Sequence, residues 1–248
     1  MSGTKQTTRQ LFSRSILSAG IVMALSVSTA NADVITLGFE EFGVVDESEE
    51  IGDFYTGGTN EAGVTGPDYG MTFSDNALAL TSRTTDEPEA EGNFENNPVD
   101  DNIMFFLGGD AATLNVEGGF ETGFSFYYSS SEEAFVDVYS EPGGEGELLE
   151  SLELSANWRD NDCVTDVSIP YCNFDPVGVN FDGVAQSVDF GGTINRVGYD
   201  AITLGTDRPG ESTPVDPTPV PAPATLALFL VGMGGLALRG VRSRIRKS

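Results

Sequence analysis

Histidine is missing from the 248 residues of this chain, and cysteine and tryptophan are rare, with two copies and one copy. Without histidine the chain cannot build a Ser-His-Asp or Cys-His nucleophile system, or a zinc or haem site ligated by imidazole. Basic residues are also scarce, with 12 Lys and Arg against 39 Asp and Glu and a formal net charge of −27. Because so negative a chain is repelled by phosphate, we expect no binding to nucleic acid.

The few basic residues gather at the two ends of the chain. Three lie in the first 14 residues and five in the last ten. The remaining four are Arg83, Arg159, Arg196 and Arg208. All acidic residues fall between Asp33 and Asp216. Two basic ends and an acidic middle therefore need separate interpretations.

Residues 1–32 have the three parts of a secretory signal peptide. A basic region precedes an apolar run from Ile16 to Val27, and Ala30-Asn31-Ala32 matches an A-x-A cleavage site. The run is shorter than the roughly 20 residues that a spanning helix needs, which argues against an uncleaved anchor. We therefore expect cleavage after Ala32.

The C-terminal part combines a proline-rich stretch, an apolar run and a basic tail. Half of the 12 prolines lie in residues 209–223, which predicts an extended spacer over residues 207–221 because proline fixes φ and lacks a donor. An uncharged run predicts a transmembrane helix over about residues 222–238, near the lower length limit. The basic tail, residues 239–248, contains Arg239, Arg242, Arg244, Arg246 and Lys247. It should stay in the cytoplasm, so that the acidic part faces outward.

This arrangement resembles the PEP-CTERM sorting signal of exosortase-dependent surface proteins of Gram-negative bacteria. The motif residues are Val220, Pro221, Ala222 and Pro223, and Ala222 stands where that family usually has Glu. The resemblance covers residues 220–248. It implies an inner-membrane precursor that an exosortase cuts near the motif, so that the ectodomain reaches the cell surface or the extracellular matrix. A permanent C-terminal anchor is the alternative, and the missing L-P-x-T-G motif disfavours a Gram-positive sortase signal.

Residues 33–206 show the two-residue period of β-strands. Apolar side chains alternate in three runs: Phe120 to Tyr128, Ala112 to Val116, and Val184 to Phe190. Further strands are expected over 35–39, 134–139, 148–154, 177–181 and 196–204, and glycine pairs predict turns at 57–58, 108–109, 118–119, 143–144 and 191–192. No stretch has a convincing helical period. We therefore expect an all-β ectodomain, a single β-sandwich or jelly roll.

Several segments of this domain resemble secreted jelly-roll ectodomains that often precede such a sorting tail. They include residues 52–58, 69–74, 123–128, 187–192 and 200–205. The resemblance implies a fold and a location, and it implies no substrate.

Cys163 and Cys172 are the two cysteines, with eight residues between them. An exported chain meets an oxidising compartment, so we expect them to form a disulfide rather than two free thiols.

Two groups of acidic residues are candidates for a structural Ca²⁺. Asp160, Asp162 and Asp166 supply the hard oxygen ligands that Ca²⁺ prefers, although the loop lacks the Gly and Glu of an EF-hand and also suits a plain solvated loop. Jelly rolls related to carbohydrate-binding modules often hold Ca²⁺ between an acid near the first strand and an Asp near the last. By that resemblance, Glu40 or Glu41 would pair with Asp200, with Ala201 where a second acid is usual.

The expected function rests mainly on the export signals, because no group of residues stands out as a binding or catalytic site. Trp158, Tyr127, Tyr128 and Tyr55 could stack on sugar rings, but aromatics in β patterns more often pack in the core. With 39 acids, no pair stands out as a glycosidase pair. We therefore expect a non-enzymatic surface or matrix protein, sorted by an exosortase, with a structural or adhesive role in exopolysaccharide or biofilm. A carbohydrate-binding module is the alternative, and a glycoside hydrolase is less favoured.

Overall fold

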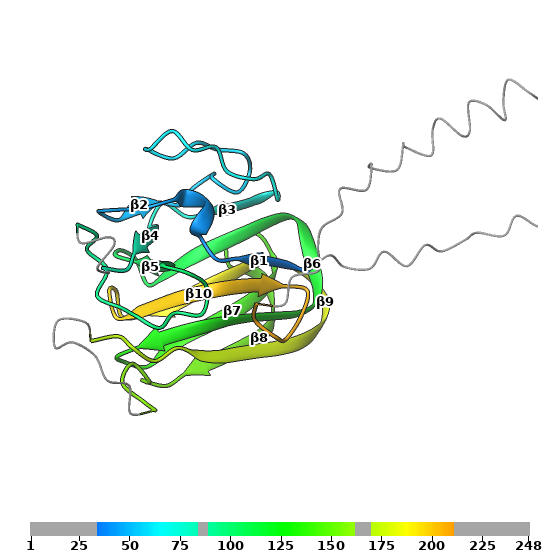
Figure 1. Cartoon of the computed structure of the whole chain (residues 1–248). Coiled ribbons are helices and arrows are strands. Elements are labelled where there is room, and N and C mark those ends of the chain that lie inside the picture. The colour runs from blue at the N-terminus through cyan, green and yellow to red at the C-terminus, as the bar shows by residue number, and fades with distance from the viewer. Residues whose placement is uncertain (1–33, 84–88, 162–169, 211–248) are drawn as a thin grey trace, which may run out of the picture. The chain divides into compact units, whose positions relative to one another are not determined.

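The computed structural model describes residues 34–83, 89–161 and 170–210. These residues form β1 (Ile35–Leu37), η1 (Glu40–Phe42), β2 (Glu49–Glu50), β3 (Met71–Phe73), β4 (Ala77–Thr81), β5 (Asn102–Phe106), β6 (Ala111–Ser130), β7 (Ala134–Glu141), β8 (Glu145–Leu154), β9 (Asp175–Gly192) and β10 (Val197–Leu204). Apart from η1, a short 3₁₀ turn, every one of these elements is a strand. The expected all-β fold is therefore confirmed (Figure 1).

The predicted signal peptide, spacer, sorting motif, transmembrane helix and basic tail all lie outside the described residues, and they stay predictions. Within the described ranges, no helix has the length and apolar character needed to cross a membrane.

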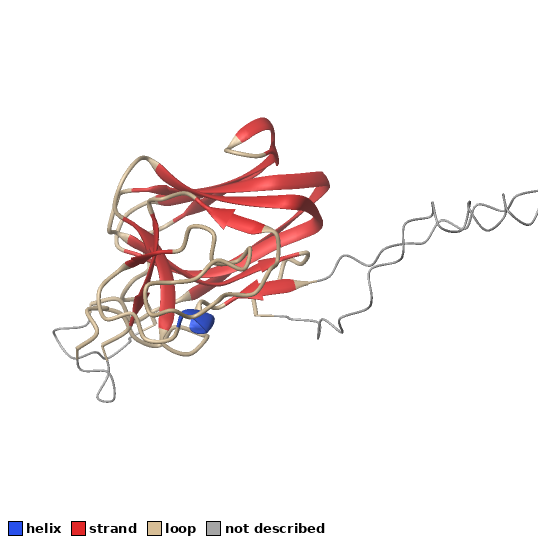
Figure 2. Cartoon of the chain, turned by 90° about the horizontal axis from the view of Figure 1, so that it is seen from above, coloured by secondary structure: helices blue, strands red, loops and turns tan. Residues whose placement is uncertain are grey.

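All strand pairs are antiparallel, and two long strands connect two layers. The first half of β6 pairs with β3 and with the end of β9, which continues to β7 and β8. The second half of β6 pairs with β10 and with the start of β9, and β10 continues to β5, β4 and β2, with β1 also pairing with β10. Figure 1 shows β6 and β9 curving from one layer to the other, and Figure 2 shows the layers of strands from above. The result is a β-sandwich, as the alternation indicated.

The core between the layers is rich in phenylalanine. Phe190, near the end of β9 in the first layer, lies 6.0 Å from Phe124 and 4.9 Å from Tyr199 of the second layer, measured between ring centroids. All three side chains are fully buried. These ring contacts hold the two inner faces together, since edge-to-face aromatic pairs add about 0.5–1.5 kcal/mol to the burial of their area.

The turn predicted at Gly118-Gly119 was wrong, because β6 continues through both residues. The register with β9 shifts twice between Asn115 and Thr122, and Gly119 has a φ of 66°. A Cβ atom at Gly119 would lie 2.5 Å from Val184 of β9. These glycines therefore form a β-bulge that bends the strand. The bulge also breaks the alternation expected in β9, so that Val184 is 41% exposed.

The outer face of the second layer is partly covered by loops. All residues of β5 and of β10 are buried, although each strand presents only one face to the core. We call the loop after β4 and the loop before β9 the two covering segments. An isolated bridge between Phe94 and Tyr171 joins them. The coverage leaves a small pocket on this outer face.

Candidate functional site

Glu40 and Asp200 form one of the two groups expected to hold calcium. Their carboxylates both contact the segment that precedes β5. Glu40 begins the 3₁₀ turn after β1, and Asp200 lies in β10 where its register with β6 shifts. Glu40 Oε1 accepts the backbone N–H of Asn102 at 2.8 Å, and Asp200 Oδ2 accepts that of Val99 at 2.9 Å. Both carboxylates therefore hold the segment that leads into β5.

Burial raises the pKa of both carboxyl groups to about 7. Asp200 is fully buried, and the charge of Glu40 adds to the rise while hydrogen bonds from Val99, Ala201 and Asn97 oppose it. Burial is also the largest cause for Glu40, followed by an opposing hydrogen bond from Asn102. Glu41, the alternative partner, instead accepts the Tyr55 hydroxyl at 3.3 Å.

The pair does not by itself make a full calcium shell. Ca²⁺ takes six to eight oxygen ligands. The described residues contain no group of three or more acidic or cysteine side chains that could hold a metal ion. Three of the four carboxylate oxygens of Glu40 and Asp200 already accept N–H groups. Calcium at this place stays a prediction.

The second calcium candidate is described only in part. Asp160 is exposed in the loop after β8, whereas Asp162 and Asp166 lie outside the described residues. Cys172 is 3% exposed and is not a free thiol, but Cys163 also lies outside the described residues, so the pairing stays a prediction.

The pocket on the outer face of the second layer has an apolar floor and an aromatic rim. It is lined by Leu80, Asn93, Phe94, Ile103, Phe105, Ser129, Tyr171, Phe174, Asn195, Val197 and Gly198, and we call it the Tyr171 pocket. The floor comes from β4, β5, β6 and β10, and the rim comes from the two covering segments and from the loop before β10. Its volume is about 40 Å³.

Gly198 keeps the floor of the Tyr171 pocket open. It pairs with Ser129 across β10 and β6, and a Cβ atom there would lie 2.7 Å from Ile103 Cδ1. Because the nearest atom is the end of a flexible side chain, an added methyl group would reduce the space without breaking the strand.

Ser129 is among the residues that line the Tyr171 pocket, and its hydroxyl is buried and unpaired. Its side chain is 1% exposed, and its Oγ has no hydrogen-bond partner among the described residues. A buried hydroxyl without a hydrogen-bond partner lowers the stability of the fold by about 1–3 kcal/mol.

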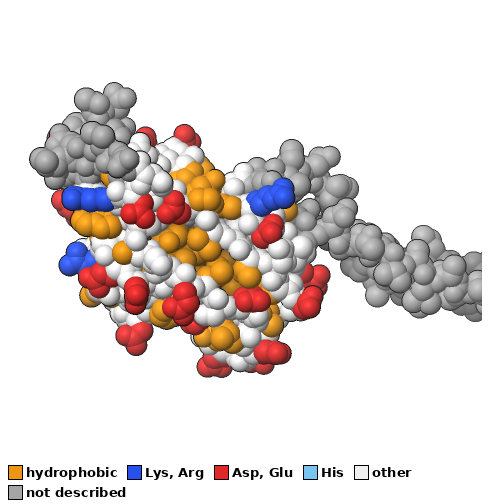
Figure 3. All heavy atoms as spheres, turned by 90° about the horizontal axis from the view of Figure 1, so that it is seen from below, with side chains coloured by type: hydrophobic (Ala, Val, Ile, Leu, Met, Phe, Trp, Pro, Cys, Tyr) orange, Lys and Arg blue, Asp and Glu red, His pale blue; other side chains and the backbone are white. Residues whose placement is uncertain are grey.

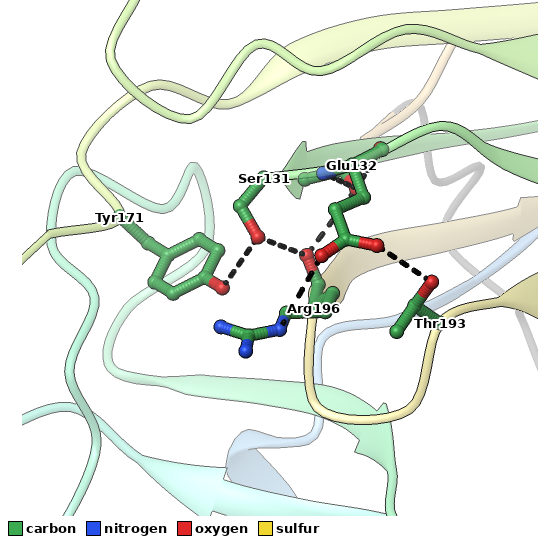
Figure 4. A network of polar contacts seen from close by, with 6 residues as sticks. Ser131, Glu132, Tyr171, Thr193 and Arg196 are labelled. Carbon is green, nitrogen blue, oxygen red and sulfur yellow. Dashed lines mark hydrogen bonds and ion pairs between the residues drawn. The ribbon is translucent and has the colours of Figure 1, made fainter.

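A polar network holds the rim in place (Figure 4). The Tyr171 hydroxyl lies 3.0 Å from Ser131 Oγ. Beside them Glu132 accepts the Thr193 hydroxyl at 2.8 Å and lies 3.7 Å from Arg196 Nε. The ion pair is exposed and contributes little to stability, but the hydroxyl contact fixes the orientation of the Tyr171 ring.

The aromatic residues that surround the pocket were mostly missed from the sequence. Tyr55 and Tyr128, two of the expected sugar-stacking candidates, are 0% and 6% exposed and belong to the core. Trp158 is partly exposed, and its ring lies 5.6 Å from that of Tyr171 and under the Arg159 guanidinium. No periodic pattern marks Tyr171, because it lies in a loop.

A larger hollow lies near the 3₁₀ turn. Its volume is about 490 Å³, and it is lined by Phe42, Ser48, Glu49, Glu50, Ile51, Gly52, Asp53, Phe54, Thr59, Asn60, Glu61 and Leu78. Its aromatic members, Phe42 and Phe54, are buried and stacked on each other, with ring centroids 3.9 Å apart. The acidic hollow therefore offers no ring face on which a sugar could stack.

Comparisons with known proteins assign this chain to no family. No family model matches the chain, and no curated protein matches it. Among solved structures, a family 6 carbohydrate-binding module is 18% identical, with a TM-score of 0.32 over 54% of this chain and 83% of that one. A glycoside hydrolase family 43 arabinoxylan arabinofuranohydrolase from Bacillus subtilis, solved with cellotetraose, is 14% identical, with a TM-score of 0.32 over 58% of this chain and 31% of that one. Likenesses at this TM-score support no argument about this chain.

Proposed function

We propose that this chain is an exported, non-enzymatic surface protein whose jelly-roll-like β-sandwich binds carbohydrate at the Tyr171 pocket. The supporting observation is the combination found there: a fixed, partly exposed tyrosine ring, an apolar floor, and the exposed amides of Asn93 and Asn195 at the rim. Sugar sites use this combination because pyranose C–H faces are apolar whereas their substituents form hydrogen bonds.

The lining of the pocket supports binding without hydrolysis. None of its residues is an Asp or Glu. Glycoside hydrolases generally place two carboxyl groups beside the bond they cut. A binding role also agrees with the structural or adhesive function in exopolysaccharide or biofilm that export to the cell surface favours.

Figure 3 shows a band of hydrophobic side chains across one face, with acidic side chains around it. The negative surface should keep the domain soluble through self-repulsion and should disfavour polyanionic partners. We therefore propose a neutral saccharide as ligand.

Glycan-array screening of the full-length protein, followed by calorimetric titration of the glycans that bind, tests this function. Tyr171→Ala should lose most of the affinity, since stacking and the rim geometry depend on that ring. Tyr127→Ala is the matched control, because Tyr127 is a partly exposed tyrosine on the same outer face that does not line the pocket. Binding that is unchanged by Tyr171→Ala, or absent for every glycan, would contradict the proposal.

Export and sorting rest on the sequence motifs alone, and they are proposed on that basis. In a cell with an exosortase, intact mass of the surface protein should show a chain that begins at Asp33 and lacks residues 239–248. A surface form that retains the basic tail would leave only the permanent anchor.

A further inference from the structure

We infer that Asn157 and Asn173 are positioning residues of the Tyr171 pocket. With Asp175 their side-chain amides form a buried network that fixes the backbone next to Tyr171 and the ring that packs against it. This inference rests on the proposed carbohydrate-binding function and names residues that hold the same site in its binding arrangement.

The network begins at Asn157, in the loop after β8. Its side chain is buried, and its Oδ1 accepts the backbone N–H of Ser130 at 2.8 Å. Its Nδ2 donates to the carbonyl oxygen of Tyr128 at 3.0 Å and to Asp175 Oδ2 at 2.9 Å. Asn157 therefore attaches this loop to the end of β6 and to the start of β9.

Asn173 connects the same loop to the segment that carries Tyr171. Its side chain is also buried, and its Nδ2 donates to the carbonyl oxygen of Asn157 at 3.1 Å and to Asp175 Oδ2 at 3.0 Å. Both amide groups thus use both of their hydrogens. Such a network makes the loops rigid, because a displacement would leave buried polar groups without partners.

Backbone hydrogen bonds connect the network to two aromatic rings. The Trp158 carbonyl oxygen accepts the N–H of Cys172 at 3.0 Å and that of Asn173 at 3.3 Å. Cys172 directly follows Tyr171, whose ring centroid lies 5.6 Å from that of Trp158. The network therefore holds the two segments that carry these rings in one arrangement.

The small size of the pocket makes the position of the Tyr171 ring important. The pocket measures about 40 Å³, whereas a cavity that accepts benzene measures about 150 Å³, so a sugar ring has to stay at the rim. There Tyr171 supplies the aromatic face. A ring that is oriented before the sugar arrives loses less conformational freedom on binding. Residues that orient Tyr171 therefore increase the affinity without contacting the sugar.

Asn173→Ala tests the inference, because it removes two hydrogen bonds of the network and leaves every residue that lines the pocket in place. The full-length protein is titrated calorimetrically, far below its Tm, with the array glycan that the wild type binds most tightly. We expect the affinity to fall about three- to tenfold. If Asn173 only stabilised the fold, the affinity would not change at this temperature, since nearly all molecules stay folded.

Trp158 provides a second measurement, because it is the only tryptophan of the chain. In Asn173→Ala its fluorescence should move to longer wavelength, and acrylamide should quench it more strongly, as its ring packs less closely against Tyr171. This measurement needs no glycan.

Exchange of two partners gives a stricter test. Asn173→Asp places a second carboxylate beside Asp175 and should lower the affinity more than Asn173→Ala does, because the two charges repel each other. Addition of Asp175→Asn restores one amide–carboxylate pair and should recover part of the affinity. Asn173→Ser keeps one donor and replaces Asn173→Ala if that variant does not fold.

Asn76→Ala is the matched control. The Asn76 side chain donates to the carbonyl oxygens of Gly108 and Ala111, outside the network and outside the pocket. Its loss should lower stability and leave the glycan affinity and the Trp158 fluorescence unchanged.

Two outcomes separate this inference from the proposed function. If the wild type binds a glycan and the Asn173 variants bind it equally tightly, or if Asn76→Ala lowers the affinity as much, the inference is overturned and carbohydrate binding stands. If the wild type binds no arrayed glycan, the proposed function is overturned and the inference with it.

Discussion

Asp200→Asn should change how the free energy of unfolding depends on pH. Asp200 is fully buried, and its pKa is about 7 against an ordinary value of 3.8. The folded state therefore binds this proton more tightly than the unfolded chain does. Asp200 contributes stability that is fully present below about pH 4 and is lost as the pH rises through 7. At about 1.36 kcal/mol per pKa unit, the loss amounts to roughly 4 kcal/mol.

Asparagine has almost the same shape but stays neutral at every pH. It can accept only one of the N–H groups of Val99 and Ala201 on its oxygen, so the variant loses a hydrogen bond by an amount that does not depend on pH. Relative to the wild type, the variant should therefore gain about 4 kcal/mol between pH 4 and pH 8. In a domain of this size that corresponds to roughly 10 °C in Tm.

Urea unfolding at several pH values in EDTA and a constant high NaCl concentration measures this difference. Glu40→Gln should shift the profile less, because Glu40 is only half-buried and water screens its charge. Parallel stability profiles of wild type and Asp200→Asn from pH 4 to pH 8 would refute the reasoning.

The same unfolding experiment, repeated with Ca²⁺ in place of EDTA, tests the predicted calcium site. A cation held by Glu40 and Asp200 would keep both carboxylates ionised, so millimolar Ca²⁺ at pH 8 should stabilise the wild type but not Asp200→Asn. If Ca²⁺ stabilises both proteins equally, or neither, calcium does not bind at this pair.

Three other changes have expected outcomes. Asp137 faces Asp189 directly across β7 and β9, so Asp137→Asn should raise the free energy of unfolding by roughly 0.2–1 kcal/mol in low salt, and lower stability in urea would contradict this. Alkylation without reduction should label neither Cys163 nor Cys172, and reduction should lower Tm by several degrees, whereas labelling of the native protein would exclude the disulfide. Tm should rise between 0.01 and 1 M NaCl, because screening weakens repulsion among the acidic residues, and a constant Tm would argue against this role of the charge.

The sequence located the strands well where their alternation is uninterrupted. Phe124, Phe126 and Tyr128 are buried on one face of β6 as the two-residue period indicated. The period failed at Gly119 and Val184, where a bulge adds a residue to one strand and reverses which side chains face the core. A glycine pair between two alternating runs has the same local pattern in a turn and in a bulge, so the sequence could not distinguish them.

The candidate site was less predictable than the strands. The expectation that joined Glu40 to Asp200 came from a resemblance, and the structure places both against the segment before β5. The Tyr171 pocket had no such signal. Its residues come from strands and loops between Leu80 and Gly198, and none of them carries a local motif.

By itself, the sequence determined the all-β class and the large negative charge of this protein, and it gives the grounds for expecting export. Those properties depend on local alternation, on composition and on short linear motifs, which need no knowledge of distant contacts. Only the tertiary structure decided that Tyr171 and Gly198 line one pocket, and that Glu40 and Asp200 both contact the segment before β5. These contacts join residues that are far apart in the sequence. Their burial and hydrogen bonding depend on neighbours that the order of residues does not reveal.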